Sequence, residues 1–176
     1  MKKILLLALL AFSVSINSSH AEFFNSTGTI DVYFSPRGHC TEAIIKQLDN
    51  ANTEILIQAY SFTSVSIARA ITDAQKRGVH IEIILDKSQR TAKYSGADFV
   101  AHAWATYIDV AHAIAHNKIM IIDRKTLITG SFNFTKAAEE KNAENLLIIS
   151  GNSPLVNRYI QNFELHKNHS ERYYGR

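Results

Sequence analysis

A strand, a helix and a second strand in the first half of the chain constrain its fold more than any other feature. Residues 54–60 and 79–85 are nearly continuous apolar runs, a pattern typical of strands that are covered on both faces. Between them, Ser64 is a helix-capping residue, and apolar residues then recur at helical spacing until Lys76-Arg77-Gly78. This order predicts a βαβ unit, and therefore an α/β sheet with at least some parallel strands.

The rest of the chain continues the alternation of strands and helices. Further strands are expected at residues 29–34, near 107–108, and at 118–122, 127–130 and 145–149. Helices are expected at residues 41–48, as a short segment within 86–115, and from Ser153 towards Tyr173, with Ser153 as the N-cap and Pro154 as the first helical residue. No repeat or linker divides the sequence. The predicted fold class is α/β, a single domain with a mixed β-sheet flanked by helices on both faces.

The N-terminus has the layout of a secretory signal peptide. Met1-Lys2-Lys3 is basic, an apolar run follows, and Ser19-His20-Ala21 offers small residues for cleavage. The apolar run is shorter than the ~20 residues that span a bilayer. We expect cleavage after Ala21, a mature domain of residues 22–176, a periplasmic or secreted bacterial location, and no stable membrane association after cleavage.

Charge and cysteine content exclude several classes of protein. Without Lys2 and Lys3 the formal net charge falls from +3 to +1, so the chain is not a polybasic protein that coats nucleic acid. Cys40 is the only cysteine, which excludes an internal disulfide and a cysteine-rich zinc site. We expect Cys40 to be an inert residue near the start of a helix.

A predicted hairpin between residues 116 and 133 carries the candidate chemistry. Its polar turn is Asp123 to Thr126, and a loop centred on Arg124-Lys125 pairs residues whose numbers sum to 249. This register places four polar side chains on one face at the open end of the hairpin: His116, Lys118, Ser131 and Asn133. Gly130 lies beside them and would let a ligand approach the backbone.

These four groups suit a phosphodiester. Lys118 supplies a cation, while Ser131 and Asn133 supply neutral donors to the phosphate oxygens. Neutral His116 can attack phosphorus or move a proton. Asp123 lies about seven residues, or ~23 Å, from His116 along the strand, so we expect it to fix the turn through local hydrogen bonds.

The same residues resemble the signature of the phospholipase D superfamily. That signature is His-x-Lys, four residues, Asp, six residues, Gly-Ser-x-Asn, and it is met from His116 to Asn133 without departure. Residues 55–62, 81–86 and 142–145 are also similar to the family. With a signal peptide and one motif, the chain looks most like the short bacterial endonucleases of this superfamily. The resemblance implies a phospholipase D/nuclease-like fold, a phosphohistidine intermediate without metal or cofactor, and a nucleophile-orienting role for Glu144.

A single motif leaves the mechanism short of one acid/base group. If His116 attacks phosphorus, the leaving oxygen needs a proton and water must later be activated. A two-fold homodimer would bring a second His116 and Lys118 to the site, so we expect a homodimer with one shared site. His102, Asp109 and His112 are alternative acids within the chain, although His102, His112 and Trp104 are better explained as core or surface residues.

The sequence therefore favours a metal-independent, non-specific DNA endonuclease. The nearest alternative is a phospholipase D-type enzyme that cleaves a lipid phosphodiester with the same groups. A non-catalytic nucleic-acid-binding module is a second alternative, although binding alone would not need His116. A metallonuclease is a weaker alternative still.

Overall fold

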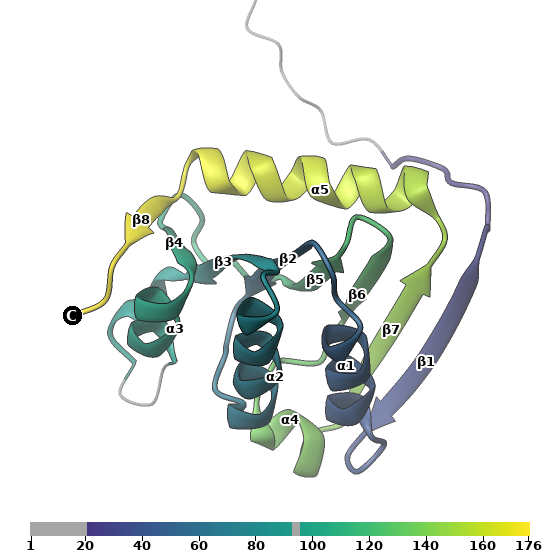
Figure 1. Cartoon of the computed structure of the whole chain (residues 1–176), viewed down its shortest axis with the longest axis horizontal. Helices are drawn as coiled ribbons and strands as arrows, with labels where there is room; N and C mark the ends of the chain where they lie inside the picture. The colour runs from purple at the N-terminus through teal and green to yellow at the C-terminus, as the bar shows by residue number, and fades with distance from the viewer. Residues whose placement is uncertain (1–20, 93–95) are drawn as a thin grey trace, which may run out of the picture.

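The computed structural model describes residues 21–92 and 96–176, and these residues form a mixed sheet (Figure 1). The predicted signal peptide lies outside the described residues, apart from Ala21. Within the described part of the chain the sheet has eight strands in the order β1-β7-β6-β5-β2-β3-β4-β8. Their bounds are β1 Thr29–Ser35, β2 Glu54–Ala59, β3 His80–Asp86, β4 Ala105–Asp109, β5 Lys118–Ile122, β6 Thr126–Gly130, β7 Glu144–Ser150 and β8 Glu171–Tyr173. Strands β2, β3 and β4 are parallel neighbours, as the βαβ pattern predicts, and the other pairs are antiparallel.

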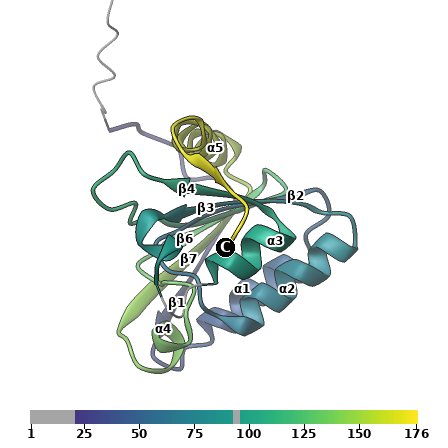
Figure 2. The same cartoon turned by 90° about the vertical axis from the view of Figure 1, so that its left-hand side faces the viewer.

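Helices cover both faces of this sheet, which confirms the predicted fold class. Helices α1 (Cys40–Asp49), α2 (Val65–Lys76) and α3 (Ala97–Ala103) lie on one face, and the long helix α5 (Ser153–Asn168) lies on the other (Figure 2). The 3-10 turn η1 (Lys87–Arg90) follows β3, and the short helix α4 (Lys136–Glu140) lies between β6 and β7. Among the described residues, no helix is long and apolar enough to cross a membrane.

Two apolar cores hold these layers together. One packs α1, α2 and α3 against the sheet through residues such as Ile44, Ile71 and Val100. The other packs Val156, Ile160 and Phe163 of α5 against the opposite face. Residues 119–122 of β5 are buried because both cores use that strand, which explains its apolar run.

Cys40 lies fully buried at the start of α1, as expected of an inert residue. Burial and the negative charge of Glu139 raise the pKa of its thiol to about 11, which disfavours the nucleophilic thiolate.

Two predictions about the helices differ from the structure. Ser64 does cap α2, since its side chain accepts the N–H of Ile67. The cap of α5, however, is Asn152 rather than Ser153, because the Asn152 side chain reaches the N–H of Leu155. Helix α5 also ends at Asn168 instead of running to Tyr173. The residues beyond it form β8, whose pairing with β4 supplies backbone hydrogen bonds that a longer helix would have to forgo.

The predicted hairpin register is wrong by one residue. Met120 pairs with Ile128 and Ile122 pairs with Thr126, so paired numbers sum to 248 rather than 249. The cause is a three-residue turn of Asp123, Arg124 and Lys125, in which the first two residues have left-handed φ angles of 53° and 54°. Turn length fixes hairpin register, and an odd loop cannot be distinguished from an even one by the flanking apolar pattern alone.

Asp123 ties this turn to a distant part of the chain. Its carboxylate accepts the N–H groups of Asn52 and Thr53 at 2.9 and 2.7 Å, and the Thr53 hydroxyl at 2.8 Å. The sequence analysis expected local hydrogen bonds within the turn. The bonds instead hold the hairpin against the loop between α1 and β2. Burial raises the pKa of the Asp123 carboxyl, but the hydrogen bonds from Thr53 and Asn52 outweigh it and lower the pKa below its ordinary value.

Replacing Asp123 by Asn should lower the free energy of unfolding by about 1–3 kcal/mol at pH 7, because the charged acceptor is lost. Asn still tolerates the left-handed φ, so the substitution isolates the charge. The folded-state pKa is depressed, so this stability is present above the ordinary carboxyl pKa. It is lost as pH falls through the folded-state pKa, and the difference from wild type should shrink below about pH 4.

Urea unfolding at both pH values measures this effect. The control is Asp31→Asn on β1, an exposed position where a change below about 0.5 kcal/mol is expected. An Asp123→Asn deficit that is equally large at pH 7 and at low pH would show that the carboxylate charge does not hold the turn.

Candidate active site

The predicted site residues, apart from Asp123, line one cavity at the edge of the sheet where β5 and β7 begin and β6 ends. The cavity has a volume of about 540 Å³ and is lined by His116, Lys118, Gly130, Ser131, Asn133, Glu144 and Asn145. The four side chains that the sequence placed together do meet here, and Glu144 joins them from the start of β7. Asp123 lies at the other end of the hairpin and is not among the lining residues.

The backbone is irregular at Gly130, where β6 ends beside the cavity. Gly130 has a φ of 144°, and the N–H groups of Ser131 and Phe132 both donate to the carbonyl oxygen of Asn145, at 3.1 and 3.2 Å. Two residues of one strand thus face one residue of its neighbour, as in a β-bulge. Phe132 lies in the same core as Ile128 of β6, so the alternation of faces continues past Gly130, and Ser131 and Asn133 lie on the opposite face, at the cavity.

The glycine itself is required by a backbone contact. A Cβ atom at position 130 would lie 2.3 Å from the carbonyl oxygen of Asn145, and a φ of 144° is unfavourable for any other residue. The sequence analysis expected a glycine that lets a ligand approach. The structure shows that close approach of β7 already demands it.

Lys118 is a buried cation at the base of the cavity. Lys118 is only 7 % exposed, and its Nζ donates to the carbonyl oxygen of His116 at 2.7 Å. Burial lowers the pKa of the ammonium, and the negative charge of Glu144 opposes that effect. Glu144 in turn accepts a hydrogen bond from Asn142 at 3.2 Å. Lys118 therefore holds a positive charge close to the exposed ring of His116, and Glu144 favours that charge.

Tyr60 is a neighbour that the sequence analysis missed. Its ring centre lies 4.5 Å from that of His116, and the Nζ of Lys118 lies 5.0 Å from the ring centre of Tyr60. The Tyr60 N–H also donates to the carbonyl oxygen of Asn117, at 2.9 Å. Tyr60 follows β2, whose last residue Ala59 pairs with Lys118, so only the β2–β5 pairing could have located it.

Ser131 and Asn133 retain hydrogen-bonding capacity for a ligand. The Oγ of Ser131 accepts the backbone N–H and the side-chain amide of Asn145, at 3.0 and 3.2 Å. Its own hydroxyl proton is therefore available to a phosphate oxygen. The buried amide oxygen of Asn133 has no hydrogen-bond partner among the described residues. Turning this amide over would present its NH₂ group as a donor instead.

A second hollow of about 520 Å³ continues from the site along α5. It shares His116, Lys118 and Gly130 with the first cavity, and α5 contributes Leu155, Arg158, Tyr159 and Asn162. Glu22 and Phe24 of the N-terminal segment complete it, and Glu22 forms an ion pair of 2.5 Å with Arg158. No motif in the sequence marked these α5 residues, because their contribution depends on how the helix packs across the sheet.

The three alternative acids lie elsewhere. His102, Asp109 and His112 are not among the residues that line either hollow. The ring of His102 contacts the carbonyl oxygen of Asp98, while Asp109 and His112 bond to each other. Trp104 is 4 % exposed and belongs to the core, as expected.

The arrangement of the lining groups fits the binding and attack of a phosphodiester. One exposed imidazole, one buried ammonium and two neutral donors converge from adjacent strands, and each is placed by the sheet or by the bulge. A tetrahedral or bipyramidal phosphorus species carries negative charge on its oxygens, and fixed donors of this kind stabilise it. The site thus offers a candidate nucleophile and fixed donors for a phosphate.

Comparisons with known proteins agree with this chemistry. A family model described as a cardiolipin synthase, phospholipase D-like domain matches residues 44–167. A phospholipase D of Rickettsia conorii is 38 % identical over 156 residues, covering 86 % of this chain and 78 % of its own. A mitochondrial cardiolipin hydrolase of Mus musculus is 30 % identical over 125 residues, covering 69 % of this chain and 55 % of its own.

The fold is similar to solved structures as well. The structure of Nuc, a phospholipase D family member from Salmonella typhimurium, superposes with a TM-score of 0.79 and 34 % identity, covering 82 % of this chain and 97 % of that one. NucT from Helicobacter pylori superposes with a TM-score of 0.75 at 23 % identity, covering 82 % and 99 %, and this likeness concerns the fold alone.

Replacing Lys118 by Met should weaken the binding of inorganic phosphate by about 10–100-fold, because a charge-assisted hydrogen bond is lost. Isothermal titration calorimetry measures the dissociation constant. The matched control is Lys125→Met in the hairpin turn, at the other end of the hairpin, which should leave phosphate binding unchanged. Equal losses in both variants would mean that phosphate is attracted by overall charge and not held in the cavity.

Proposed function

The chain belongs to the phospholipase D superfamily of phosphodiesterases, and we propose that it is a metal-independent endonuclease that cleaves DNA without base preference. The observation that carries this proposal is the convergence of His116, Lys118, Ser131 and Asn133 on one open cavity. The ring of His116 is exposed, whereas Lys118 is buried. The nucleophile is therefore accessible to substrate and lies beside a fixed positive charge.

The proposed reaction has two displacements at phosphorus. A ring nitrogen of His116 attacks phosphorus, a P–N bond forms, and the P–O bond to the leaving alkoxide breaks as an acid supplies the alkoxide with a proton. The same acid, now a base, then takes a proton from water, whose oxygen attacks phosphorus and breaks the P–N bond. Lys118, Ser131 and Asn133 hold the non-bridging oxygens throughout, and Glu144 orients and balances the charge of the site.

The acid in this scheme is His116 of a second copy of the chain. The described residues that line the cavity include a single histidine, so one chain supplies a nucleophile without an opposing acid. A two-fold axis beside the cavity would place the second imidazole across the phosphate. Edge strand β1 exposes Ile30, Val32 and Phe34, and Phe34 pairs with the cavity residue Asn145, so a second copy that covers β1 would also approach the site.

The substrate is the finer part of the proposal. The hollow beside α5 is open and lined by polar and charged groups such as Arg158 and Asn162, which suits a phosphate backbone that passes over the surface. The names of the Rickettsia and mouse relatives support the alternative, a lipid phosphodiester. With its predicted signal peptide, the enzyme would act in the periplasm or outside the cell.

Wild-type protein should nick plasmid DNA at full rate in EDTA, and His116→Ala should lower the rate by at least about 1,000-fold, because the nucleophile is absent. Plasmid relaxation is measured alongside head-group release from phosphatidylcholine and cardiolipin vesicles, at a temperature where circular dichroism shows both proteins folded. His102→Ala, a histidine outside the cavity, is the matched control and should cleave normally.

Three results bear on this proposal directly. Activity that EDTA abolishes in the folded protein, and that Mg²⁺ restores, would overturn the metal-free mechanism. Vesicle hydrolysis without DNA cleavage would favour the lipid enzyme. Acid-labile, alkali-stable phosphate trapped on wild type but not on His116→Ala would support the phosphohistidine, whereas DNA binding without turnover would favour a binding module.

A heterodimer with a single His116 should be almost inactive, because the site would lack either its nucleophile or its acid. Wild-type and His116→Ala chains with different affinity tags are co-expressed, and the mixed dimer is isolated by tandem purification. The control is a mixed dimer of wild type with His102→Ala, which should retain full activity. A half-active His116→Ala heterodimer, or a purified active monomer, would contradict a shared site.

A further inference from the structure

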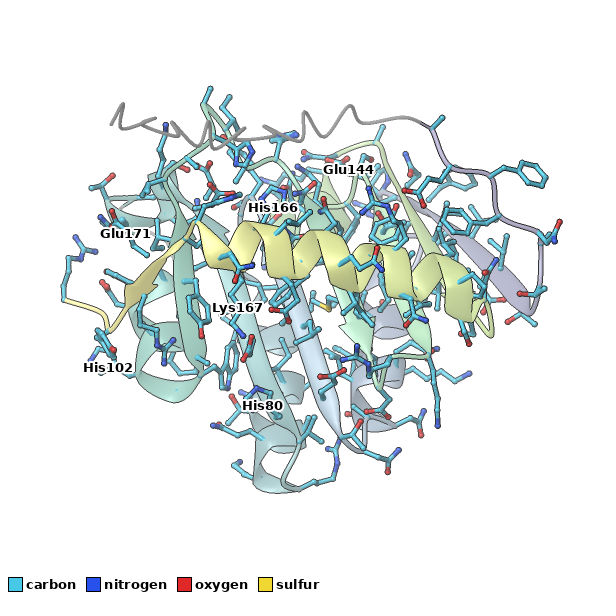
Figure 3. All side chains as sticks on the ribbon, turned by 90° about the horizontal axis from the view of Figure 1, so that it is seen from above. His80, His102, Glu144, His166, Lys167 and Glu171 are labelled. Atoms are coloured by element: carbon cyan, nitrogen blue, oxygen red, sulfur yellow. The ribbon has the colours of Figure 1, made fainter. Side chains whose placement is uncertain are left out.

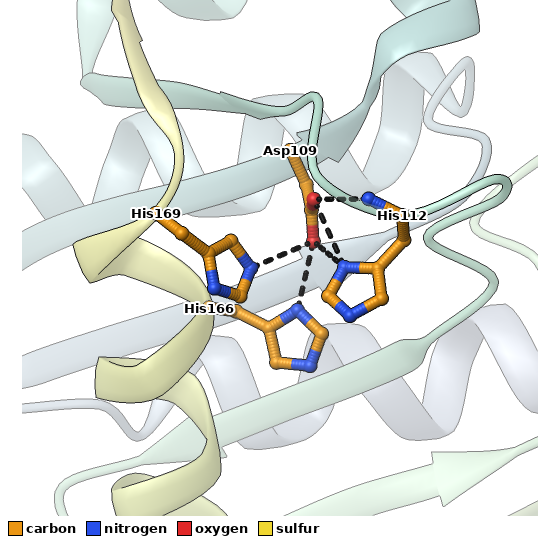
Figure 4. A group of neighbouring side chains, drawn as sticks. All are labelled: Asp109, His112, His166 and His169. Atoms are coloured by element: carbon orange, nitrogen blue, oxygen red, sulfur yellow. Dashed lines mark hydrogen bonds and ion pairs between the residues drawn. The ribbon is translucent and has the colours of Figure 1, made fainter. Parts of the chain in front are cut away.

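A second group of chemically active side chains lies away from the phosphodiesterase cavity, around Asp109 (Figure 4). Asp109 is the last residue of β4 and is fully buried, His112 lies in the loop that follows, and His166 and His169 lie at the C-terminal end of α5. Seen from the α5 side, His166 lies near the end of that helix that leads to Glu171 on β8 (Figure 3). The three imidazole rings surround one carboxylate.

The candidate ligand atoms are close to the spacing of a metal site. The Nδ1 atoms of His166 and His112 lie 2.8 and 2.9 Å from Oδ2 of Asp109, and the Nε2 of His169 lies 3.4 Å from it. All four ligand atoms lie within 4.8 Å of one another. Ligands about 2.0 Å from a tetrahedral zinc ion are about 3.3 Å apart, so small rotations of the rings would close the set around an ion.

The surroundings of the group also favour a cation. The Asp109 side chain is 0 % exposed, so water does not screen its charge from a nearby cation. Oδ1 is held by the backbone N–H of Ala111 at 3.1 Å, which leaves Oδ2 facing the three rings. His166 and His169 are 15 % and 37 % exposed at their side chains, so an ion can reach the group from solvent.

We propose that Asp109, His112, His166 and His169 bind one Zn²⁺ ion per chain. Three imidazoles and a carboxylate are ligands that zinc prefers, and four ligands from the protein leave no open position for a substrate. The ion is therefore structural. This inference goes beyond the proposed function and does not depend on it.

The ion would link two parts of the fold, helix α5 and the segment that leads to His116. His166 and His169 belong to α5, whereas Asp109 and His112 begin the segment that runs to His116. That segment is already fixed near its other end, because Asp86 accepts the N–H of Ala115 at 2.7 Å. Zinc would fix it at its start as well, and would join β4 to the end of α5. It positions the loop that carries His116 without touching substrate.

The test is zinc binding to the chelator-treated, dialysed protein. Competition with a chromogenic zinc chelator should give one ion per chain, and saturating Zn²⁺ should raise the melting temperature by about 5–10 °C. His166→Gln and His169→Gln should each weaken zinc binding by at least about 100-fold, more than the loss of an outer-shell partner. Co²⁺ bound in place of zinc should show the intense visible absorption of a tetrahedral ion, and this absorption should be lost in both variants.

Two control variants make the outcome decisive. His80→Gln removes an exposed histidine that pairs with Glu82 on β3 and should bind zinc as wild type does. His116→Ala should also bind zinc normally while it loses cleavage, so failure of the zinc site and failure of the proposed nuclease are separable. Stoichiometry well below one ion, or His166→Gln and His169→Gln both binding zinc as tightly as His80→Gln, would overturn the proposal. His169 is the more exposed ligand, so His169→Gln keeps the test available if His166→Gln does not fold.

Discussion

The carbonyl oxygen of Asn145 accepts two backbone N–H groups, from Ser131 and Phe132, and the geometry of the cavity beside Lys118 depends on this bond pair. The two bonds hold the chain after β6 against β7, so that Ser131 stays at the cavity while Phe132 enters the same core as Ile128. Gly130 permits this close approach by leaving room for the Asn145 backbone, and the side chain of Asn145 then holds Ser131.

The cavity also illustrates how a sheet accommodates a buried charge. Lys118 is the first residue of a strand that is otherwise apolar, and its ammonium is satisfied by the carbonyl of His116, the face of Tyr60 and the nearby Glu144. An unpaired buried ammonium would cost far more than the strand gains by packing. These three partners of the Lys118 ammonium are therefore needed for folding as well as for chemistry. Asp123 has the complementary role, since it stabilises the far end of the hairpin and contributes nothing to the cavity.

Local patterns in the sequence predicted most of the elements and which side chains meet at the cavity. The βαβ unit, the Ser64 cap and the buried strands follow from periodicity and capping, which act within a few residues. The register of the hairpin, the end of α5 and the role of Tyr60 could not be predicted in the same way. Each depends on contacts between segments far apart in sequence, and residues 171–173 are as compatible with a last helical turn as with a strand until β4 is beside them. The group around Asp109 was missed as well, because His166 lies 57 residues after Asp109 in the sequence.

The position of β1 has a consequence for how the chain reaches this fold. Among the described strands β1 comes first in the chain and has β7 as its one partner, and Thr29 meets Ser150 about 120 residues later. During synthesis the first strand to emerge must wait until nearly the whole domain is available, with Ile30, Val32 and Phe34 uncovered. Loop closure of this length makes β1–β7 docking a late and slow event. Off-pathway association should therefore begin at the N-terminal strand rather than at the parallel centre of the sheet, where β2, α2 and β3 are neighbours in sequence.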